Sequence, residues 1–108
     1  MLMGPYQISA VDSYVTRSSP GVYVLSRDGR TANYVGRSDT DIGARIKASA
    51  SEGYGYAYFW FENAASPRDA FNKECEYYHR YNPPDNKNHP AVPFGTNWRC
   101  PIIGCPWS

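Results

Sequence analysis

The dipeptide Asp28-Gly29 constrains the fold of this chain more than any other feature. It separates two β-prone runs, residues 22–26 and 31–35, and Asp-Gly between such runs is a strong signal for a two-residue hairpin turn. A two-residue turn fixes the register of a hairpin, and here it predicts that Tyr23 lies opposite Tyr34. Opposed residues have Cβ atoms about 5 Å apart on one side of the sheet, so we expect the two phenols to be neighbours.

The same register places Gly21 opposite Gly36, beside the phenols. Glycine inside a strand weakens the strand and often marks the close approach of a ligand or a backbone. An ordinary aromatic cross-strand pair is the alternative interpretation, because such pairs are common in sheets. The glycines favour the ligand interpretation slightly.

Periodicity and capping signals predict the remaining elements. They are a short helix within 8–17, a helix over 39–49 capped by Asp39 or Thr40, a strand over 54–62, and a helix that Ser66-Pro67 opens and Pro83-Pro84 ends. From residue 85 onward the chain is loop-like. The order predicts a small α/β fold (α+β layered), with a three-stranded antiparallel sheet flanked by helices.

Glu74 breaks the amphipathic pattern of the last predicted helix. At about 100° per residue it lies among the aromatic side chains of the inward arc, whereas Glu76 lies on the polar arc with His79. Burial of a charged side chain costs free energy unless a partner or a metal compensates the charge. Glu74 therefore indicates an ion pair with an arginine, a local misfit of the helix, or a functional carboxylate.

Length and composition fit one domain over residues 1–108. The chain is 42% apolar and 16% aromatic, which suffices for a packed core, and its net charge is +1. Residues 1–47 carry six basic and four acidic side chains, so a nucleic-acid surface is expected as a local patch on this half. No stretch reaches the roughly 20 apolar residues that span a membrane. Three cysteines are a poor disulfide framework and no signal peptide is visible, so we expect a cytoplasmic, reducing location.

The predicted hairpin carries "GVY" at 21–23 and "YVG" at 34–36, with ten residues between the two tyrosines. These tripeptides resemble the two halves of the motif that names the GIY-YIG nuclease superfamily. The resemblance continues through Arg45 in the next helix and Glu74 in the later one. It then includes Pro83 and, three residues on, Asn86.

The resemblance covers a motif core at residues 20–88, and residues 89–108 form a C-terminal extension outside the pattern. The segments "YVGRSDTDIGARIK" and "ECEYYHRYNPPDN" are similar to the nuclease domain of the excinuclease C subunit and to small stand-alone members. Several positions in the right order and spacing are far more specific than either tripeptide alone. The resemblance implies the GIY-YIG fold.

It also implies a divalent-metal-dependent endonuclease that hydrolyses phosphodiester bonds in nucleic acid, with DNA expected. Glu74 would hold one Mg²⁺ or Mn²⁺, and Mg²⁺ accepts few protein ligands because it keeps several waters. Tyr23 would be the general base, although a free phenol titrates near pH ~10 and needs a nearby cation to act at neutral pH. Tyr34 would position water or phosphate, and Arg45 would stabilise the developing charge. Asn86 would orient Glu74 or tie its loop to the site.

Four further residues are expected to contact nucleic acid: Arg37, Lys47, Ser49 and Lys87. Two of them depart from the family pattern. The family often has lysine where this chain has Arg37. Arginine keeps the positive charge but cannot act as a base. Ser49 stands where many members carry histidine or tyrosine, and serine is a poor proton acceptor. A base or phosphate ligand is therefore missing at this position or supplied elsewhere.

Simpler roles and other functions stay open. Arg45 could pair with Asp41 one helical turn away, and Asn86 could be a turn residue after Pro-Pro. The same fold with a weakened site would bind nucleic acid without cutting it. A homodimer is compatible with the sequence but not required by it.

A zinc site is a minor alternative. The four residues between Cys100 and Cys105 fit the spacing of zinc pairs, and His89 lies nearby. A tetrahedral set needs further ligands, and only Cys75 and the two histidines remain. Both histidines, His79 and His89, are expected at the surface. A Cys100–Cys105 disulfide is a further possibility.

Overall fold

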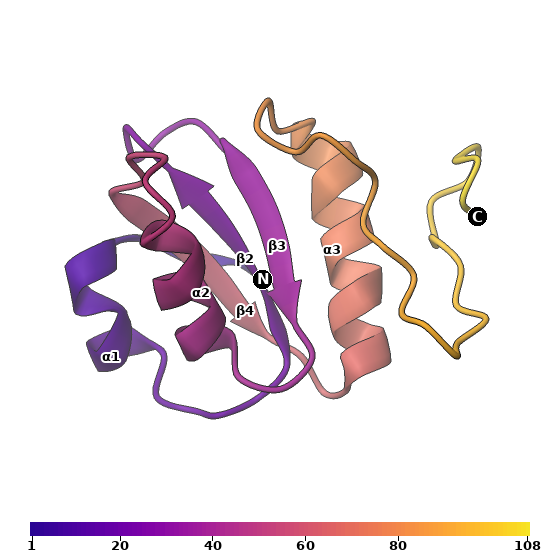
Figure 1. Ribbon diagram of the computed structural model, residues 1–108, viewed down its shortest axis with the longest axis horizontal. Coiled ribbons are helices and arrows are strands. Elements are labelled where there is room, and N and C mark those ends of the chain that lie inside the picture. Colours follow the sequence, from indigo (N-terminus) through magenta and orange to yellow (C-terminus); the bar gives the residue numbers. More distant parts are fainter.

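Four antiparallel strands form a single sheet in a computed structural model that describes residues 1–108. The strands follow the order β1-β4-β2-β3, with α1 and α2 on one face and α3 on the other (Figure 1). None of the helices is both long and apolar enough to cross a bilayer. The elements are β1 (Met3–Gln7), the 3₁₀ turn η1 (Ile8–Ala10), α1 (Val11–Tyr14), β2 (Gly21–Ser26), β3 (Tyr34–Ser38), α2 (Ile42–Ala50), β4 (Tyr58–Asn63) and α3 (Pro67–Tyr81).

The predicted layered α+β class is confirmed, but the prediction of three strands was wrong. The fourth strand is β1, which pairs with the edge of β4. Its sequence, MGPYQ, is short and mostly exposed, and Gly-Pro interrupts it, so it lacks the alternation that identifies a strand. Tertiary contacts supply what the local pattern does not, because Tyr6 lies opposite Phe59 and stacks on Tyr14 with ring centroids 3.7 Å apart.

The core lies on both sides of the central strand β2, whose six residues are all buried. Tyr23 and Leu25 point toward α2, where they pack with Ile42, Ile46 and Phe59. The alternate residues of β2 point toward α3. Packing on both faces fixes the position of β2, and the pairing of β3 with β2 then sets where the side chains of β3 lie.

The hairpin register differs from the prediction by two residues. Tyr23 lies opposite Gly36, and Tyr34 lies opposite Leu25. The Asp28 carboxylate accepts hydrogen bonds from the backbone N–H groups of the two residues after Gly29, at 2.8 and 2.7 Å. This local bonding, of the kind that short acidic side chains make in turns, widens the connection to residues 27–33.

The corrected register explains Gly36. A Cβ atom on Gly36 would lie 2.5 Å from Cζ and Oη of Tyr23, so the phenol crosses β3 where the strand has no side chain. The close approach that glycine marks here is therefore that of a neighbouring side chain rather than of a ligand. Tyr23 and Tyr34 are still neighbours, with ring centroids 6.4 Å apart, whereas Gly21 lies opposite Ser38 and not Gly36.

The helix starts follow capping chemistry. The prediction that Ser66 opens α3 with Pro67 at its first position is confirmed, since the Ser66 hydroxyl accepts from Asp69 N–H at 3.0 Å. The predicted caps of α2 were wrong, because Asp41 is the N-cap. The Ser38 hydroxyl accepts the backbone N–H groups of residues 40 and 41, and this turn delays the helix.

Candidate active site

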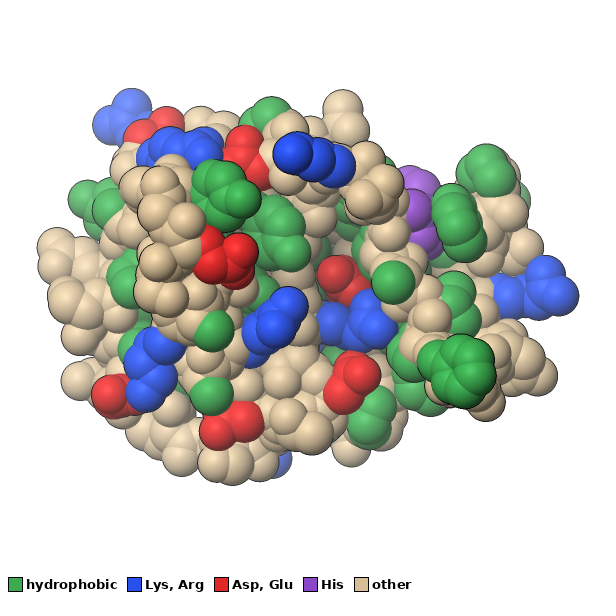
Figure 2. All heavy atoms as spheres, in the orientation of Figure 1, with side chains coloured by type: hydrophobic (Ala, Val, Ile, Leu, Met, Phe, Trp, Pro, Cys, Tyr) green, Lys and Arg blue, Asp and Glu red, His purple; other side chains and the backbone are tan.

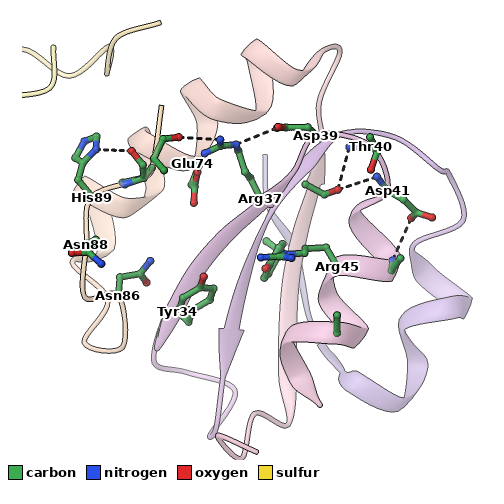
Figure 3. A pocket seen from close by; sticks show the side chains of 16 residues that line it. Tyr34, Arg37, Asp39, Thr40, Asp41, Arg45, Glu74, Asn86, Asn88 and His89 are labelled. Carbon is green, nitrogen blue, oxygen red and sulfur yellow. Dashed lines mark hydrogen bonds and ion pairs between the residues drawn. The ribbon is translucent and has the colours of Figure 1, made fainter. Parts of the chain in front are cut away.

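A cleft of about 630 Å³ opens at the edge strand β3, between α2 and α3. It is lined by all five residues that the sequence singled out as catalytic: Tyr23, Tyr34, Arg45, Glu74 and Asn86. They come from β2, β3, α2, α3 and the segment after α3, and Figure 3 shows most of them around the same space. Figure 2 shows basic and acidic side chains meeting in this hollow.

Glu74 points inward from α3 and is only 8% exposed. Its Oε1 accepts a hydrogen bond from Arg37 Nη1 at 2.5 Å, and Arg37 Nε pairs with Asp39 at 3.1 Å. Burial raises the pKa of Glu74, and the Arg37 guanidinium offsets part of that rise. Since α3 runs unbroken through this position, the ion pair rather than a helix misfit explains the inward carboxylate.

Glu74 is also suited to hold a hard cation. It accepts no hydrogen bond other than that from Arg37, and no buried side-chain polar atom of the chain lacks a partner, so its second oxygen faces the open cleft. Two other carboxylates line the cleft, and each, like Glu74, uses one oxygen: Asp39 pairs with Arg37 through Oδ1, and Asp41 caps α2 through Oδ1. The second oxygen of Glu74 is of the kind that Mg²⁺ accepts, because Mg²⁺ prefers oxygen ligands and keeps several waters.

Tyr23 is buried beneath the cleft, with 1% of its surface exposed. Its hydroxyl hydrogen-bonds the Ser49 hydroxyl, with the two oxygens 2.8 Å apart. Burial raises the pKa of Tyr23, whereas the bond to Ser49 and the charge of Arg45 act to lower it. Ser49, which the sequence assigned to nucleic-acid contact, is itself 6% exposed, so its visible contact is with this phenol.

Tyr34 and Arg45 complete the α2 side of the cleft. Tyr34 is half-buried, and burial together with the nearby Tyr23 raises the pKa of Tyr34 to about 12. Arg45 is exposed and points into the cleft (Figure 3). It makes no ion pair with Asp41, whose carboxylate caps the helix instead. The simpler role considered for Arg45 is therefore not what the structure shows.

Asn86 fastens the segment after α3 to the edge of the sheet. Its Oδ1 accepts from Val35 N–H at 2.8 Å, and its Nδ2 donates to Val35 O at 2.9 Å. The side chain thus takes the place of a neighbouring strand on β3. Of the two roles suggested by the resemblance, tying the loop to the site agrees with these bonds, whereas Asn86 makes no hydrogen bond to Glu74.

The residues expected to contact nucleic acid do not gather in one place. Arg37 lines the cleft. Lys47 lies on the other side of α2 and pairs with Asp12 at 2.9 Å. Lys87 is exposed beside an adjoining cavity of about 480 Å³ that shares Tyr34 with the cleft.

One wall of the cleft comes from the C-terminal extension, which the sequence did not assign to the site. Residues 89–91 line this wall next to Asn88, and Arg37 Nη2 donates to the Ala91 carbonyl at 3.0 Å. These residues have no periodic pattern and no recognised motif. The only available signal was that the wall follows Asn86 directly in the chain.

In comparisons with protein-family models, with curated proteins and with solved structures, the chain gave no match.

Proposed function

We propose that this chain is a divalent-metal-dependent endonuclease of the GIY-YIG type, with DNA as the expected substrate. The observation that carries the proposal is the convergence of Tyr23, Tyr34, Arg45, Glu74 and Asn86 on one cleft. These residues were selected from the sequence without the structure, and they lie as far as 63 positions apart, from 23 to 86. A shared cleft supports a shared role, because catalytic groups must reach one reacting centre.

Each side chain has a chemical task in phosphodiester hydrolysis. Glu74 would hold the cation, which when bound supplies Lewis-acid stabilisation of the phosphate. Arg45 would place its positive charge against the phosphate oxygens as negative charge develops there. Tyr23, in its ionised form, would take the proton of the attacking water. Tyr34 would hold the water or phosphate in line, and Asn86 is a positioning residue that fixes the loop.

The state of Tyr23 predicts a pH dependence. Burial raises the pKa of Tyr23, so little of the phenol is ionised at neutral pH. The ionised fraction increases as the pH rises, and cleavage should increase with it. The hydrogen bond between Tyr23 and Ser49 acts to lower this pKa, so Ser49→Ala should move the rise in cleavage rate to higher pH. A pH–rate profile of both proteins checks this, and an unchanged profile would remove Tyr23 as the base.

A nucleic-acid-binding module is the second candidate. It is favoured by the Arg37–Glu74 ion pair, since the carboxylate that would bind the cation already has a cationic partner. A module of this kind would use Arg37 and Arg45 for phosphate contacts and would not need a metal. The two functions differ in whether bound strands are cut.

The test is a cleavage and binding assay on labelled single-stranded, duplex and branched DNA and RNA, with Mg²⁺, Mn²⁺ or EDTA. Glu74→Gln should lower cleavage by at least about 100-fold, the effect typical of losing one catalytic group. Glu76→Gln is the matched control, because Glu76 lies on the exposed face of α3 and pairs only with Arg80. Binding without cutting by the parent chain would establish the module instead, and neither binding nor cutting would overturn both.

A further inference from the structure

Four side chains with metal-ligating atoms converge where α3 meets the C-terminal extension, beside the wall of the cleft. They are His79, His89, Cys100 and Cys105, and one ligand atom from each lies within 4.8 Å of the others. The histidine side chains in Figure 2 lie where the extension meets the rest of the molecule. We propose that these four residues bind one Zn²⁺ as a structural site, independently of the nuclease activity proposed above.

Two distances within the cluster match those of a tetrahedral zinc ion. Cys100 Sγ lies 3.4 Å from His79 Nε2, and Cys105 Sγ lies 3.3 Å from His89 Nε2. Bond lengths of about 2.3 Å to sulfur and about 2.0–2.1 Å to nitrogen give an S···N edge of about 3.5 Å in a tetrahedron. The two measured S···N distances therefore have about the length that one bound zinc ion would give them, although the ligands come from three separate segments.

The second contacts of the ligands orient them as metal ligands are usually oriented. His89 Nδ1 lies 2.9 Å from the Pro90 carbonyl oxygen, so Nδ1 carries the proton and Nε2 is free to bind a cation. This arrangement, with one ring nitrogen on the metal and the other on a carbonyl, is typical of zinc-bound histidine. The backbone N–H of Trp107 donates to Cys105 Sγ at 3.4 Å, which suits a thiolate.

The extension needs such a link because it has little else to hold it. Residues 91–108 contain no helix or strand, and their only buried side chains are Cys100 and Cys105. Two of their large apolar side chains, Phe94 and Ile103, are fully exposed. A segment that buries so little apolar surface usually depends on a metal or a disulfide for its order.

The ligand chemistry selects zinc over the cation expected at Glu74. Two thiolates and two imidazoles form a Cys₂His₂ set, which is a closed structural zinc site, whereas Mg²⁺ prefers oxygen. Binding releases the two thiol protons and leaves a neutral site without oxidation or reduction. Cys75 is buried on α3 in the same apolar cluster but is not one of the four ligands.

His79 is exposed, as the sequence predicted, and His89 is partly buried. The proposed site would give both histidines a role as zinc ligands. The cysteine spacing alone gave half of the ligands. The other half depends on α3 presenting His79 toward the extension, and on the loop returning His89 to it, 21 and 16 residues away from their cysteine partners. The nine residues between His79 and His89 exceed the three to five that are typical of zinc-binding histidine pairs.

Metal analysis of the full chain, purified with a tag free of histidine and cysteine, tests the proposal. One zinc per chain is expected. Cys100→Ser, Cys105→Ser and His79→Ala should each lose zinc to a chelator at a concentration that leaves the parent loaded. Cys75→Ala is the matched control and should retain zinc.

Replacement of zinc by Co²⁺ in the unaltered chain guards against variants that do not fold. The thiolate-to-cobalt absorption of a tetrahedral site is expected, and the Cys75→Ala protein should show it as well. A Cys100–Cys105 disulfide found by mass spectrometry would overturn the proposal. So would a metal-free chain with three reactive thiols, or one zinc that persists in the Cys100→Ser, Cys105→Ser double variant.

Discussion

The body of the molecule, residues 1–81, and the C-terminal segment, residues 82–108, are held together in different ways. In the body, β2 is buried along its whole length and hydrogen-bonded on both sides. In the segment, the contacts with the body are those of Asn86, of a few apolar side chains and of the His/Cys cluster. The cleft lies between the two. The wall formed by the body is held by the packed sheet, whereas the wall formed by the segment is held by a few local contacts.

The largest effect is expected from a cavity in the body. Phe59 is fully buried in the core against α2, and Phe59→Ala should lower the free energy of unfolding by about 3–5 kcal/mol. That is a large part of the roughly 5–15 kcal/mol that stabilises a typical domain. Urea unfolding followed by circular dichroism measures the change.

Phe94→Ala is the control from the C-terminal segment. Phe94 is fully exposed, and its removal should change the free energy of unfolding by no more than about 0.5 kcal/mol. Similar losses for the two phenylalanines would contradict the view that apolar burial stabilises the body more than the segment.

The next effect concerns the close approach of Tyr23 to β3. The methyl group of Gly36→Ala would lie 2.5 Å from the Tyr23 ring, and this overpacking should cost about 1–3 kcal/mol. Gly43→Ala is the control, since Gly43 is helical and an added Cβ would come no nearer than 3.4 Å to another atom. It should be neutral or stabilise the protein by up to about 1 kcal/mol. Equal destabilisation of both proteins in urea unfolding would argue against the crossing phenol as the reason for Gly36.

The body could be predicted from sequence because its signals are local. Helix α3 is predicted by Ser66 and Pro67 at its start and by the amphipathic pattern from which Glu74 departs, and each of these signals depends on neighbours within a few turns. The hairpin was found, but its register was not, because the Asp28 side chain competes for backbone N–H groups. Strand β1 was missed because only its partner β4 makes it a strand.

The site could be predicted in part for the same reason. The motif selected five residues that line one cleft, but it said nothing of the wall at His89 and Ala91. The four ligand atoms of the His/Cys cluster come from positions 79 to 105. Their proximity follows from the path of a segment without periodicity, which no pattern in the sequence encodes.

A smaller effect should follow from cutting the link between the segment and the sheet. Asn86→Ala removes two hydrogen bonds and leaves the buried main chain of Val35 without these partners. The expected loss is about 1–2 kcal/mol, together with faster amide hydrogen exchange at Val35. Asn88→Ala is the control, because Asn88 lines the cleft but is exposed and makes no such bond. Unchanged exchange at Val35 in Asn86→Ala would show that water replaces the side chain without cost.

The smallest effect on the body is expected from removal of zinc, and this separates the two regions most directly. With a chelator present, the chain should keep a cooperative unfolding transition of its sheet, because no zinc ligand lies in a strand. The segment should open locally instead. Amides bonded only within it, such as Cys100 N–H to the Trp107 carbonyl at 3.0 Å, should exchange at least about tenfold faster, which corresponds to about 1.4 kcal/mol of lost protection.

Hydrogen-exchange mass spectrometry on the parent and on Glu74→Gln checks this, and both proteins should respond alike because the cleft cation is not involved. Loss of the sheet transition on chelation would mean that the body cannot fold without its extension, and the division into two regions would fail.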